Sequence, residues 1–404
     1  MRSMKHAFIT AGVRTPIGKF MGSLSSIRTD DLAAHVLAAL LSDKPQLDPA
    51  RIADVIMGCA NQAGEDNRNV ARMALLLAGL PPTVPGETLN RLCASGMSAA
   101  AHAMRAIAYG DGDLFIGGGV EHMTRGPYVM SKTSRAYGND AQLYDSSFGW
   151  RFVNPRMFEQ YGTDAMGETA ENLVDRYDIG REDQDRFAAW SQQKAARARG
   201  EGRLAEEIIP VEIPRRKQEP LLFAEDEFIK AETTEAVLAQ LKPAFRKGGS
   251  VTAGNSSGLN DGAAALLIAS EVGMKENGLE PMARLVSMGV AGVEPRIMGI
   301  GPVYATEKAL AKAGLTLDQM DLIELNEAFA AQVLACTRAM GLDDNDPRLN
   351  PNGGAIALGH PLGMSGTRLL HTAALELNKT GKRYALCTMC IGVGQGFAMV
   401  LERV

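Results

Sequence analysis

The chain has 404 residues, of which 46% are hydrophobic and 22% are charged, and its formal net charge is −5. This length exceeds one ordinary hydrophobic core, so we expect two or three domains. The mild negative charge argues against a general nucleic-acid-binding protein. No run of about 18 apolar residues is present to predict a membrane span.

The cysteines and the first residues indicate a location inside the cell. The five cysteines are an odd number in a long chain, and the apolar stretch 7–9 is too short for a signal peptide. Reduced thiols are therefore expected rather than a disulfide framework. We expect a cytoplasmic protein.

Short β-rich runs alternate with helical stretches in the first third of the chain. The segment 88–90 leads to Cys93, and the helix predicted after Cys93 is small and apolar on every face, which is typical of a buried helix. Strands are predicted at 7–10, 53–58 and 113–119, and helices at 29–41, 69–80 and 94–109.

The segment 121–249 breaks this alternation. It has a polar section at 132–147 and a long amphipathic helix that begins near Arg181, which together predict a loop domain inserted into the first half. Its basic side chains leave two interpretations open, a solvated surface and a landing site for nucleotide phosphates. These side chains are Arg197, Arg199, Arg215, Arg216 and Lys217.

The last third returns to the alternation, with strands predicted at 321–325 and 384–389 and a buried helix after His360. Alternating strands and helices predict an α/β fold with covered sheets.

A single gapless offset of 267 residues relates the two ends of the chain. It places His360 on Cys93 (360 − 267 = 93) and Asn326 on Cys59 (326 − 267 = 59). The run 363–365 then falls on 96–98, with the same Gly-Met-Ser sequence. A repeat of this kind predicts two similar α/β halves that face each other around one cleft.

The repeat pairs a candidate nucleophile with a candidate base. Cys93 lies at a predicted helix start, where free amides and the helix dipole lower a thiol pKa. His360 lies between Gly359 and Pro361 in a glycine-rich loop, which suits precise placement and proton transfer from Cys93. The alternatives are a small buried hydrophobic residue for the cysteine and a structural role for the histidine.

Two further residues fit the same chemistry. Cys387 and Cys390 have CxxC spacing, a weak metal or redox signal without a second pair, and Cys390 is instead a candidate proton carrier. Asn326 follows a predicted buried strand and is a candidate oxyanion donor, although asparagine there is also an ordinary turn residue.

Five segments, in this order, resemble the thiolase family over essentially the whole chain: 90–97, 251–262, 326–329, 350–366 and 390–396. The resemblance implies a duplicated α/β fold with layered αβαβα packing. It also implies three parts. These are an N-terminal half (1–120 plus 250–275), a loop domain (121–249) and a C-terminal half (276–404).

The resemblance also implies roles. Cys93 is the acylated nucleophile, His360 activates it, and Cys390 is the acid and base of the two half-reactions. Asn326 (through a water) and His360 form one oxyanion hole, and the backbone amides of Cys93 and Gly392 form the other. The residues implied in coenzyme A binding are Met166, Lys230, Phe245, Ser257 and Phe329.

Coenzyme A is implied as a substrate, and no metal or resident cofactor is implied. The partners are CoA thioesters, and the family resemblance implies a homodimer or homotetramer. No nucleic acid or membrane partner is expected.

Within the family, residues 58–72 and 149–155 most resemble the 3-oxoadipyl-CoA thiolases of aromatic catabolism. Ala165 departs from the histidine of acetoacetyl-CoA thiolases at this place. A 3-oxoadipyl chain ends in a carboxylate, so a cation is expected near it, and our hypothesis names Arg125 or Arg151.

The predicted reaction is cleavage of 3-oxoadipyl-CoA with CoA to succinyl-CoA and acetyl-CoA. The alternatives are an acetoacetyl-CoA or broad 3-ketoacyl-CoA thiolase, a binding protein without turnover, and a ketoacyl-synthase type of condensing enzyme. That last type has a histidine in place of the second cysteine, so Cys390 argues against it.

Overall fold

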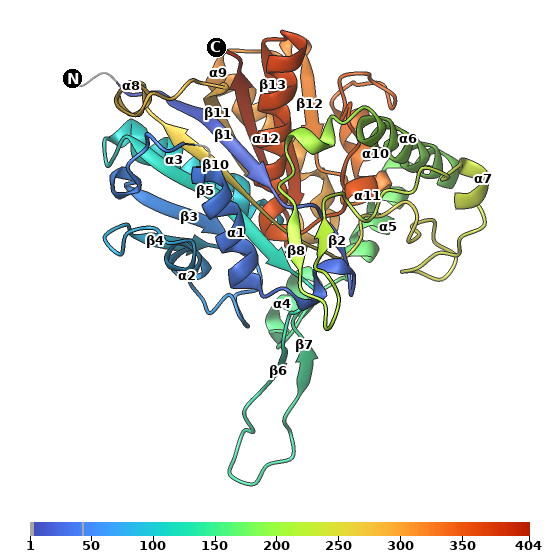
Figure 1. Ribbon diagram of the computed structural model, residues 1–404. Coiled ribbons are helices and arrows are strands. Elements are labelled where there is room, and N and C mark those ends of the chain that lie inside the picture. Colours follow the sequence, from blue (N-terminus) through green and yellow to red (C-terminus); the bar gives the residue numbers. More distant parts are fainter. Residues whose placement is uncertain (1–3, 43) are drawn as a thin grey trace.

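The computed structural model describes residues 4–42 and 44–404 (Figure 1). Its main sheet has the strand order β12-β13-β14-β11-β1-β10-β5-β3-β4, and β2 pairs with β10. In the first half the strands are β1 (Ala7–Arg14), β2 (Gly18–Lys19), β3 (Asp54–Gly58), β4 (Gly86–Leu89), β5 (Leu114–His122) and β10 (Asn260–Ala269). In the second half they are β11 (Ala283–Gly292), β12 (Leu322–Leu325), β13 (Tyr384–Ile391) and β14 (Gln395–Glu402).

The two halves meet where β1 pairs with β11. The pairing is antiparallel and joins three residue pairs, from Ala7 with Leu285 to Ile9 with Ala283. In each half a parallel pair lies beside antiparallel strands, β3 with β5 in the first half and β12 with β13 in the second. The two sheets of the layered fold are therefore hydrogen-bonded into one continuous sheet.

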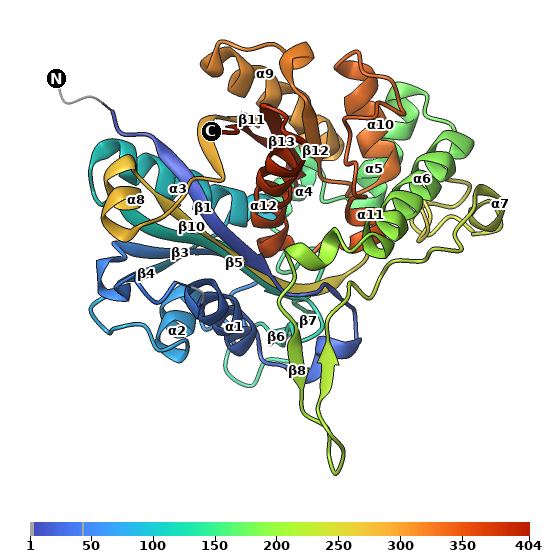
Figure 2. The same cartoon turned by 45° about the horizontal axis from the view of Figure 1, so that its top comes forward.

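Helices cover both sheets and fill the space between them (Figure 2). Helices α1 (Thr29–Ser42) and α2 (Val70–Leu77) pack on the outer face of the first half, where they share one hydrophobic core with its strands. Helices α9 (Gly301–Ala313) and α10 (Ala330–Ala339) do the same for the second half. Between the sheets lie α3 (Ser95–Tyr109) and α12 (Leu362–Thr380), which share the central core. This is the expected αβαβα order, and the predicted helices at 29–41, 69–80 and 94–109 are confirmed as α1, α2 and α3.

The starts of α3 and α12 are in close backbone contact. A Cβ atom added to Gly96 would lie 2.5 Å from the carbonyl oxygen of Gly363, which is closer than any real side chain is found. A Cβ on Gly366 of α12 would lie 2.4 Å from the backbone nitrogen of Met97 in α3. Only glycine therefore permits this packing. It brings the two predicted site turns together.

The prediction that α3 is buried on every face is correct for its first two turns only. Further along, His102, Arg105 and Tyr109 are exposed on its outer side. Helix α12 differs, because its side chains are buried along most of its length as far as Leu377. The central layer is thus asymmetric.

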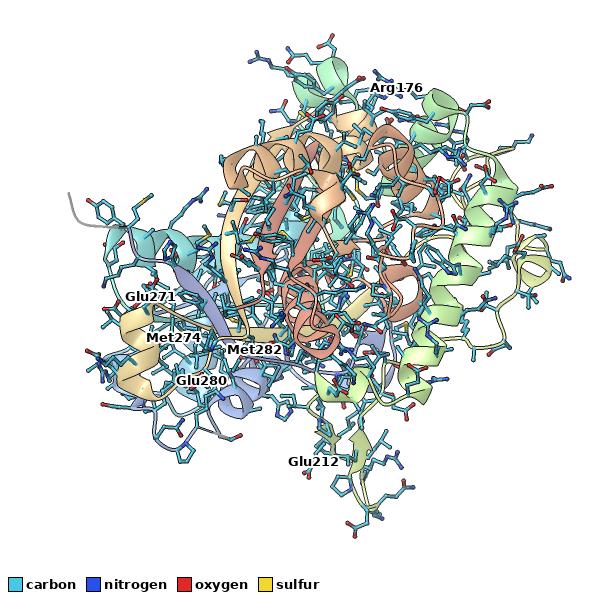
Figure 3. All side chains as sticks on the ribbon, turned by 90° about the horizontal axis from the view of Figure 1, so that it is seen from above. Arg176, Glu212, Glu271, Met274, Glu280 and Met282 are labelled. Atoms are coloured by element: carbon cyan, nitrogen blue, oxygen red, sulfur yellow. The ribbon has the colours of Figure 1, made fainter. Side chains whose placement is uncertain are left out.

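The segment 121–249 consists of short elements and two hairpins that extend from the body (Figures 1 and 2). One hairpin is β6 (Tyr128–Met130) with β7 (Leu143–Asp145), and the other is β8 (Val211–Ile213) with β9 (Leu221–Phe223). Arg215, Arg216 and Lys217 are exposed at the tip of the second hairpin, beyond Glu212 on β8 (Figure 3). The helices of this segment are α4 (Pro155–Tyr161), α5 (Met166–Tyr177), α6 (Arg181–Gly200) and α7 (Glu235–Leu238).

The remaining helices are short. Helix α8 (Glu271–Asn277), with Glu271 and Met274 labelled in Figure 3, lies between the halves in sequence, and α11 (Ala355–Leu358) precedes His360. The 3₁₀ turns are η1 (Ser23–Ser26), η2 (Pro49–Arg51), η3 (Leu92–Ala94), η4 (Leu204–Glu206), η5 (Pro295–Ile300) and η6 (Leu317–Gln319). Across residues 4–42 and 44–404, no helix is long and apolar enough to cross a membrane.

A buried ion network ties the segment 121–249 to both halves. Arg14 on β1 donates to Glu207 at 2.8 Å and to Asp226 at 2.7 Å, and Arg203 donates to Glu207 at 2.8 Å. The hydroxyl of Thr372, on α12, also donates to Glu207. Burial favours the neutral form of Glu207, but Arg14 and Arg203 outweigh it and lower the pKa of this carboxyl to about 2. Glu207 is therefore charged near neutral pH.

Candidate functional site

Cys93 lies in the turn η3, between β4 and the start of α3. Side chains on both sides hold this turn. Asn90 accepts from the backbone N–H of Leu92 at 2.8 Å, and the Ser95 hydroxyl donates to the Leu92 carbonyl at 2.7 Å. Leu92 itself has a φ of +47°, a strained value for a side chain that is not glycine. The turn therefore stores strain next to the nucleophile.

The backbone N–H groups of Gly392 and of Cys93 itself lie near the Cys93 thiol and favour its charged form. Burial raises the pKa of Cys93 to about 11, although these two N–H groups lower it. The expectation of a lowered pKa at the helix start is thus wrong in direction, because desolvation outweighs the local amides. Cys93 rests as a thiol and needs a base to become a nucleophile.

Asn260 and Ser365 fix the position of His360 at the start of α12. Its backbone N–H donates to Asn260 at 2.9 Å, and its Nδ1 lies 2.7 Å from the Ser365 hydroxyl oxygen. The Ser365 hydroxyl donates to the carbonyl of Pro361 at 2.8 Å. Since that proton is committed, Ser365 accepts from Nδ1–H, and the tautomer leaves Nε2 with a free lone pair.

Burial lowers the pKa of His360 to about 3, and the positive charge of Arg368 contributes. The imidazole is therefore neutral near pH 7. A neutral imidazole with a bare Nε2 is the form that accepts a proton.

Asn326 directly follows β12 and faces His360. Its Nδ2 lies 3.4 Å from Nε2 of His360, and its backbone N–H donates to Thr388 on β13 at 3.0 Å. Its side-chain oxygen is buried with no partner in the part of the chain that the structure describes. Asn326 and His360, which lie on separate segments of the second half, are thus side by side.

Cys390 and Gly392 complete this site from the end of β13 and its turn. Burial raises the pKa of Cys390 well above its ordinary value, and the charge of nearby Cys93 raises it further. Beside Gly392, a Cβ atom would lie 3.4 Å from the Leu92 side chain and 3.7 Å from Sδ of Met166. Met166 at the start of α5 therefore borders the same site.

The residues implied in coenzyme A binding continue from there. The rings of Phe245 and Phe329 meet edge to face at 6.0 Å, and Phe329 shares an apolar cluster with Cys390. The backbone N–H and the hydroxyl of Ser257 both donate to the Ala328 carbonyl. These three residues form one lining beside the thiols.

Lys230 lies at the far end of this lining. Its Nζ stands 5.4 Å from the centre of the Phe228 ring, and the same ring lies against Gly258, next to Ser257. The structure thus gives Lys230 a place near Ser257 without an ion pair to hold it there among the described residues.

Comparison with known proteins agrees with this arrangement. The family model described as "Thiolase, N-terminal domain" matches residues 7–272, and "Thiolase, C-terminal domain" matches residues 279–403. The chain belongs to the thiolase family.

Two curated relatives and one solved structure illustrate the likeness. The chain is 59% identical to the 3-oxoadipyl-CoA/3-oxo-5,6-dehydrosuberyl-CoA thiolase of Escherichia coli (strain K12), over 99% of this chain and 100% of that one. It is 56% identical to the beta-ketoadipyl-CoA thiolase of Acinetobacter baylyi, with the same coverage. The crystal structure of the Bacillus anthracis acetyl-CoA acetyltransferase has a TM-score of 0.92 and 40% identity, and it covers 100% of both chains.

The two arginines considered for a substrate carboxylate differ in this thiolase. The guanidinium of Arg125 is committed to the carboxylate of Glu65 and to the Ser25 carbonyl. Arg151 donates to the Ser146 carbonyl at 2.9 Å and has no ion pair within the described residues. Of the two, Arg151 keeps its charge free for a ligand.

Sequence reasoning did not single out Asn260, Ser365 or Glu121. The first two hold the backbone and the ring of His360, and Glu121 accepts from the backbone of Ala60, in the loop after β3, and of Gly363, in the His360 turn. Ser365 lies inside the repeated Gly-Met-Ser run, and Asn260 lies inside the segment 251–262, so both were within the informative segments. No local pattern marks Glu121, because its partners are far away in the sequence.

Proposed function

We propose that this thiolase cleaves 3-oxoadipyl-CoA with coenzyme A to give succinyl-CoA and acetyl-CoA, through an acyl group on Cys93. The chemistry is supported by three observations: Gly392 and Cys390 lie near Cys93, Asn326 lies beside neutral His360, and the helix starts that carry Cys93 and His360 are in backbone contact. The two curated relatives at 59% and 56% identity support the acyl chain.

In the first half-reaction, Nε2 of His360 takes the proton of Cys93, and the sulfur attacks the 3-keto carbon of the substrate. The bond between C2 and C3 then breaks, its electron pair stays on C2, and Cys390 protonates that carbon to release acetyl-CoA. The N–H groups of Cys93 and Gly392 stabilise the oxyanion at C3. Asn326 and protonated His360 stabilise the enolate oxygen of the thioester.

In the second half-reaction, the Cys390 thiolate takes the proton of incoming coenzyme A. The CoA sulfur attacks the succinyl carbonyl on Cys93, and the Cys93 thiolate leaves and recovers its proton from His360. Succinyl-CoA departs. One thiol thus acts as the acid first and as the base afterwards, which is why a second cysteine is needed beside the nucleophile.

For the distal carboxylate of the substrate, we favour Arg151. Its neighbour Trp150 donates to the carbonyl of Asp164 at 3.2 Å, and Asp164 lies two residues before Met166 at the site. The segment that carries Arg151 is therefore bonded to the segment that borders the thiols. A charge-assisted contact of this kind contributes roughly 1.5–3 kcal/mol.

The test is a panel of initial rates with 3-oxoadipyl-CoA, acetoacetyl-CoA and a medium-chain 3-ketoacyl-CoA. We expect the highest kcat/KM for the dicarboxylic ester. We also expect Arg151→Ala to lower that preference by roughly 10- to 150-fold, with Arg125→Ala as the matched control. A preference for acetoacetyl-CoA over 3-oxoadipyl-CoA would refute the acyl-chain assignment.

The same assay decides against a binding protein without turnover. Such a protein binds the esters and is labelled at Cys93, but it releases no acetyl-CoA.

We also propose that the thiolase forms a homodimer or homotetramer. In support, the hairpin arm β6–β7 and the segment after it carry several exposed large apolar side chains, more than a monomer surface usually leaves open. These are Tyr128, Met130, Tyr137, Leu143, Phe148 and Phe152. Light scattering after size exclusion tests this, and a monomer refutes it. The cytoplasmic location and the division into 1–120 plus 250–275, 121–249 and 276–404 stay predictions.

A further inference from the structure

Glu121 is a buried carboxylate at the end of β5, and it has no role in the chemistry described above. Its exposed fraction is 2%. Oε2 accepts from the backbone N–H groups of Ala60 and Gly363, both at 2.9 Å, and Oε1 accepts from Asn61 at 3.0 Å. A single side chain therefore binds one backbone segment from each half of the molecule.

The first of these segments leads to the nucleophile. The carbonyl of Ala60 accepts from Nδ2 of Asn90 at 2.8 Å, and Oδ1 of Asn90 accepts from the N–H of Leu92 at 2.8 Å. Leu92 is the strained residue that precedes Cys93. Two hydrogen-bonded steps thus join the Ala60 peptide to the nucleophile turn.

The second segment leads to the base. Gly363 lies in the first turn of α12, three residues after His360, and Ser365 in the same turn fixes the imidazole ring. The carboxylate of Glu121 also faces the N-terminus of this long helix, where a negative charge is favourable. The place of the α12 start relative to β5 is therefore set by Glu121.

The surroundings of Glu121 are themselves titratable. Burial and the nearby charge of Asp66 raise the pKa of Glu121 to about 7, although its three backbone N–H partners lower it. The thiol of Cys59 faces both carboxylates, at 3.7 Å from Asp66 and 4.0 Å from Glu121. The charge of Glu121 in turn raises the pKa of Cys93.

We propose that Glu121 is a positioning residue of the reaction, which holds the Cys93 turn and the His360 turn at their working separation. This rests on the proposed roles of Cys93 and His360, and it is independent of the acyl chain. A carboxylate suits the task because all three partners are N–H donors. A glutamine in the same place directs its own N–H₂ group against one of them, and an aspartate keeps the charge but is one methylene too short.

The test compares Glu121→Gln and Glu121→Asp with wild type. We expect kcat to fall on the order of 10²-fold in both variants, because small misplacements of reacting groups cost about this much. The KM for CoA should stay within about threefold, since the lining beside Ser257 is untouched.

The pH dependence of Cys93 alkylation by iodoacetamide adds a readout that a merely structural role does not move. It uses no CoA ester, so it is independent of the acyl-chain assignment. Glu121→Gln removes a charge that raises the pKa of Cys93, so its alkylation midpoint should move to lower pH while kcat falls. In Glu121→Asp the midpoint should stay, because the charge remains.

The matched control is Glu207→Gln, another buried carboxylate that joins the halves. Its partners are the side chains of Arg14, Arg203 and Thr372, and it binds neither site turn. We expect a lower melting temperature for this control, with kcat and the alkylation midpoint unchanged.

Folded Glu121 variants with kcat within threefold of wild type would overturn the proposal. If neither variant folds, Asn90→Ala tests the proposal instead. It removes the hydrogen bonds that join Ala60 to Leu92, and because Asn90 is exposed, its loss leaves no new group buried. A fall in kcat of about tenfold supports the path, and a change below twofold refutes it.

Discussion

The starts of α3 and α12 occupy equivalent places in the two halves, yet they are built for different tasks. At α3, the nucleophile turn is half-buried, with Cys93 and the strained Leu92 close to the surface. At α12, His360 is buried, and Asn260 and Ser365 fix its backbone and its ring. In the proposed reaction, the turn that carries Cys93 has to admit a large substrate, whereas His360 needs one tautomer in one orientation to act as the base.

The loops that follow β3 and β12 differ in the same way. Asn326 faces His360, but its counterpart Cys59 faces the carboxylates of Asp66 and Glu121. The loop after β12 therefore places a hydrogen-bond donor beside His360. The loop after β3 instead contacts two buried carboxylates and has a structural role. The two halves thus share a backbone arrangement, but the side chains at equivalent positions have different contacts.

The largest expected effect is the loss of the nucleophile. Cys93→Ala should lower kcat by roughly 10⁴- to 10⁶-fold, because it removes the thiol that carries the acyl group in the proposed reaction. Single-turnover assays with acid quench measure both the rate and the acyl-enzyme. Residual acyl-enzyme in this variant contradicts the assignment of Cys93.

The next effect is the loss of the base in the other half. His360→Asn should lower kcat by roughly 10²- to 10⁴-fold, the usual contribution of a general base. Cys93 should remain available for alkylation at high pH in this variant. A kcat close to wild type would show that the two helix starts do not act as a pair.

A stability measurement tests the close contact of the two helix starts. Gly96→Ala should lower the free energy of unfolding by about 1–3 kcal/mol, because the added methyl group overlaps the Gly363 carbonyl. Gly200→Ala at the end of α6, where no atom lies within 4 Å of an added Cβ, is the control and should be neutral or slightly stabilising. Equal melting temperatures for the two variants would contradict the packing.

The pH dependence of labelling sharpens the comparison between the thiols. Since burial raises the pKa of Cys93 to about 11, its thiolate fraction in the free enzyme should rise about tenfold per pH unit through pH 8 and 9. Cys93 should also react first, because the other four cysteines are buried. A plateau near pH 7 would show that the two N–H groups outweigh burial.

The smallest effect concerns the orientation of His360. Ser365→Ala removes the acceptor of Nδ1–H and should lower kcat by up to about tenfold, as expected for one neutral hydrogen bond. Ser98→Ala, at the equivalent place in the first half, is the matched control, since Ser98 contacts Arg91 and not Cys93. Equal effects of the two changes would contradict the assigned tautomer.

Much of this molecule could be predicted from the sequence. The 267-residue offset placed Cys93 and His360 in equivalent turns, and the alternation of strands and helices indicated covered sheets, because both signals are local or repeated. The role of Glu121 could not be predicted, because it depends on a bond to Gly363 across 242 residues. The direction of the Cys93 pKa shift was also missed, because it depends on how much protein surrounds the sulfur, and periodicity does not report that.

The glycine contact between α3 and α12 has a consequence for how such an enzyme changes over time. Where two backbones touch, any side chain larger than that of glycine forces the helix starts apart and lowers stability. We therefore expect substitutions that change the preferred acyl chain to occur in the segment 121–249. The glycines at the contact between α3 and α12 should tolerate few substitutions.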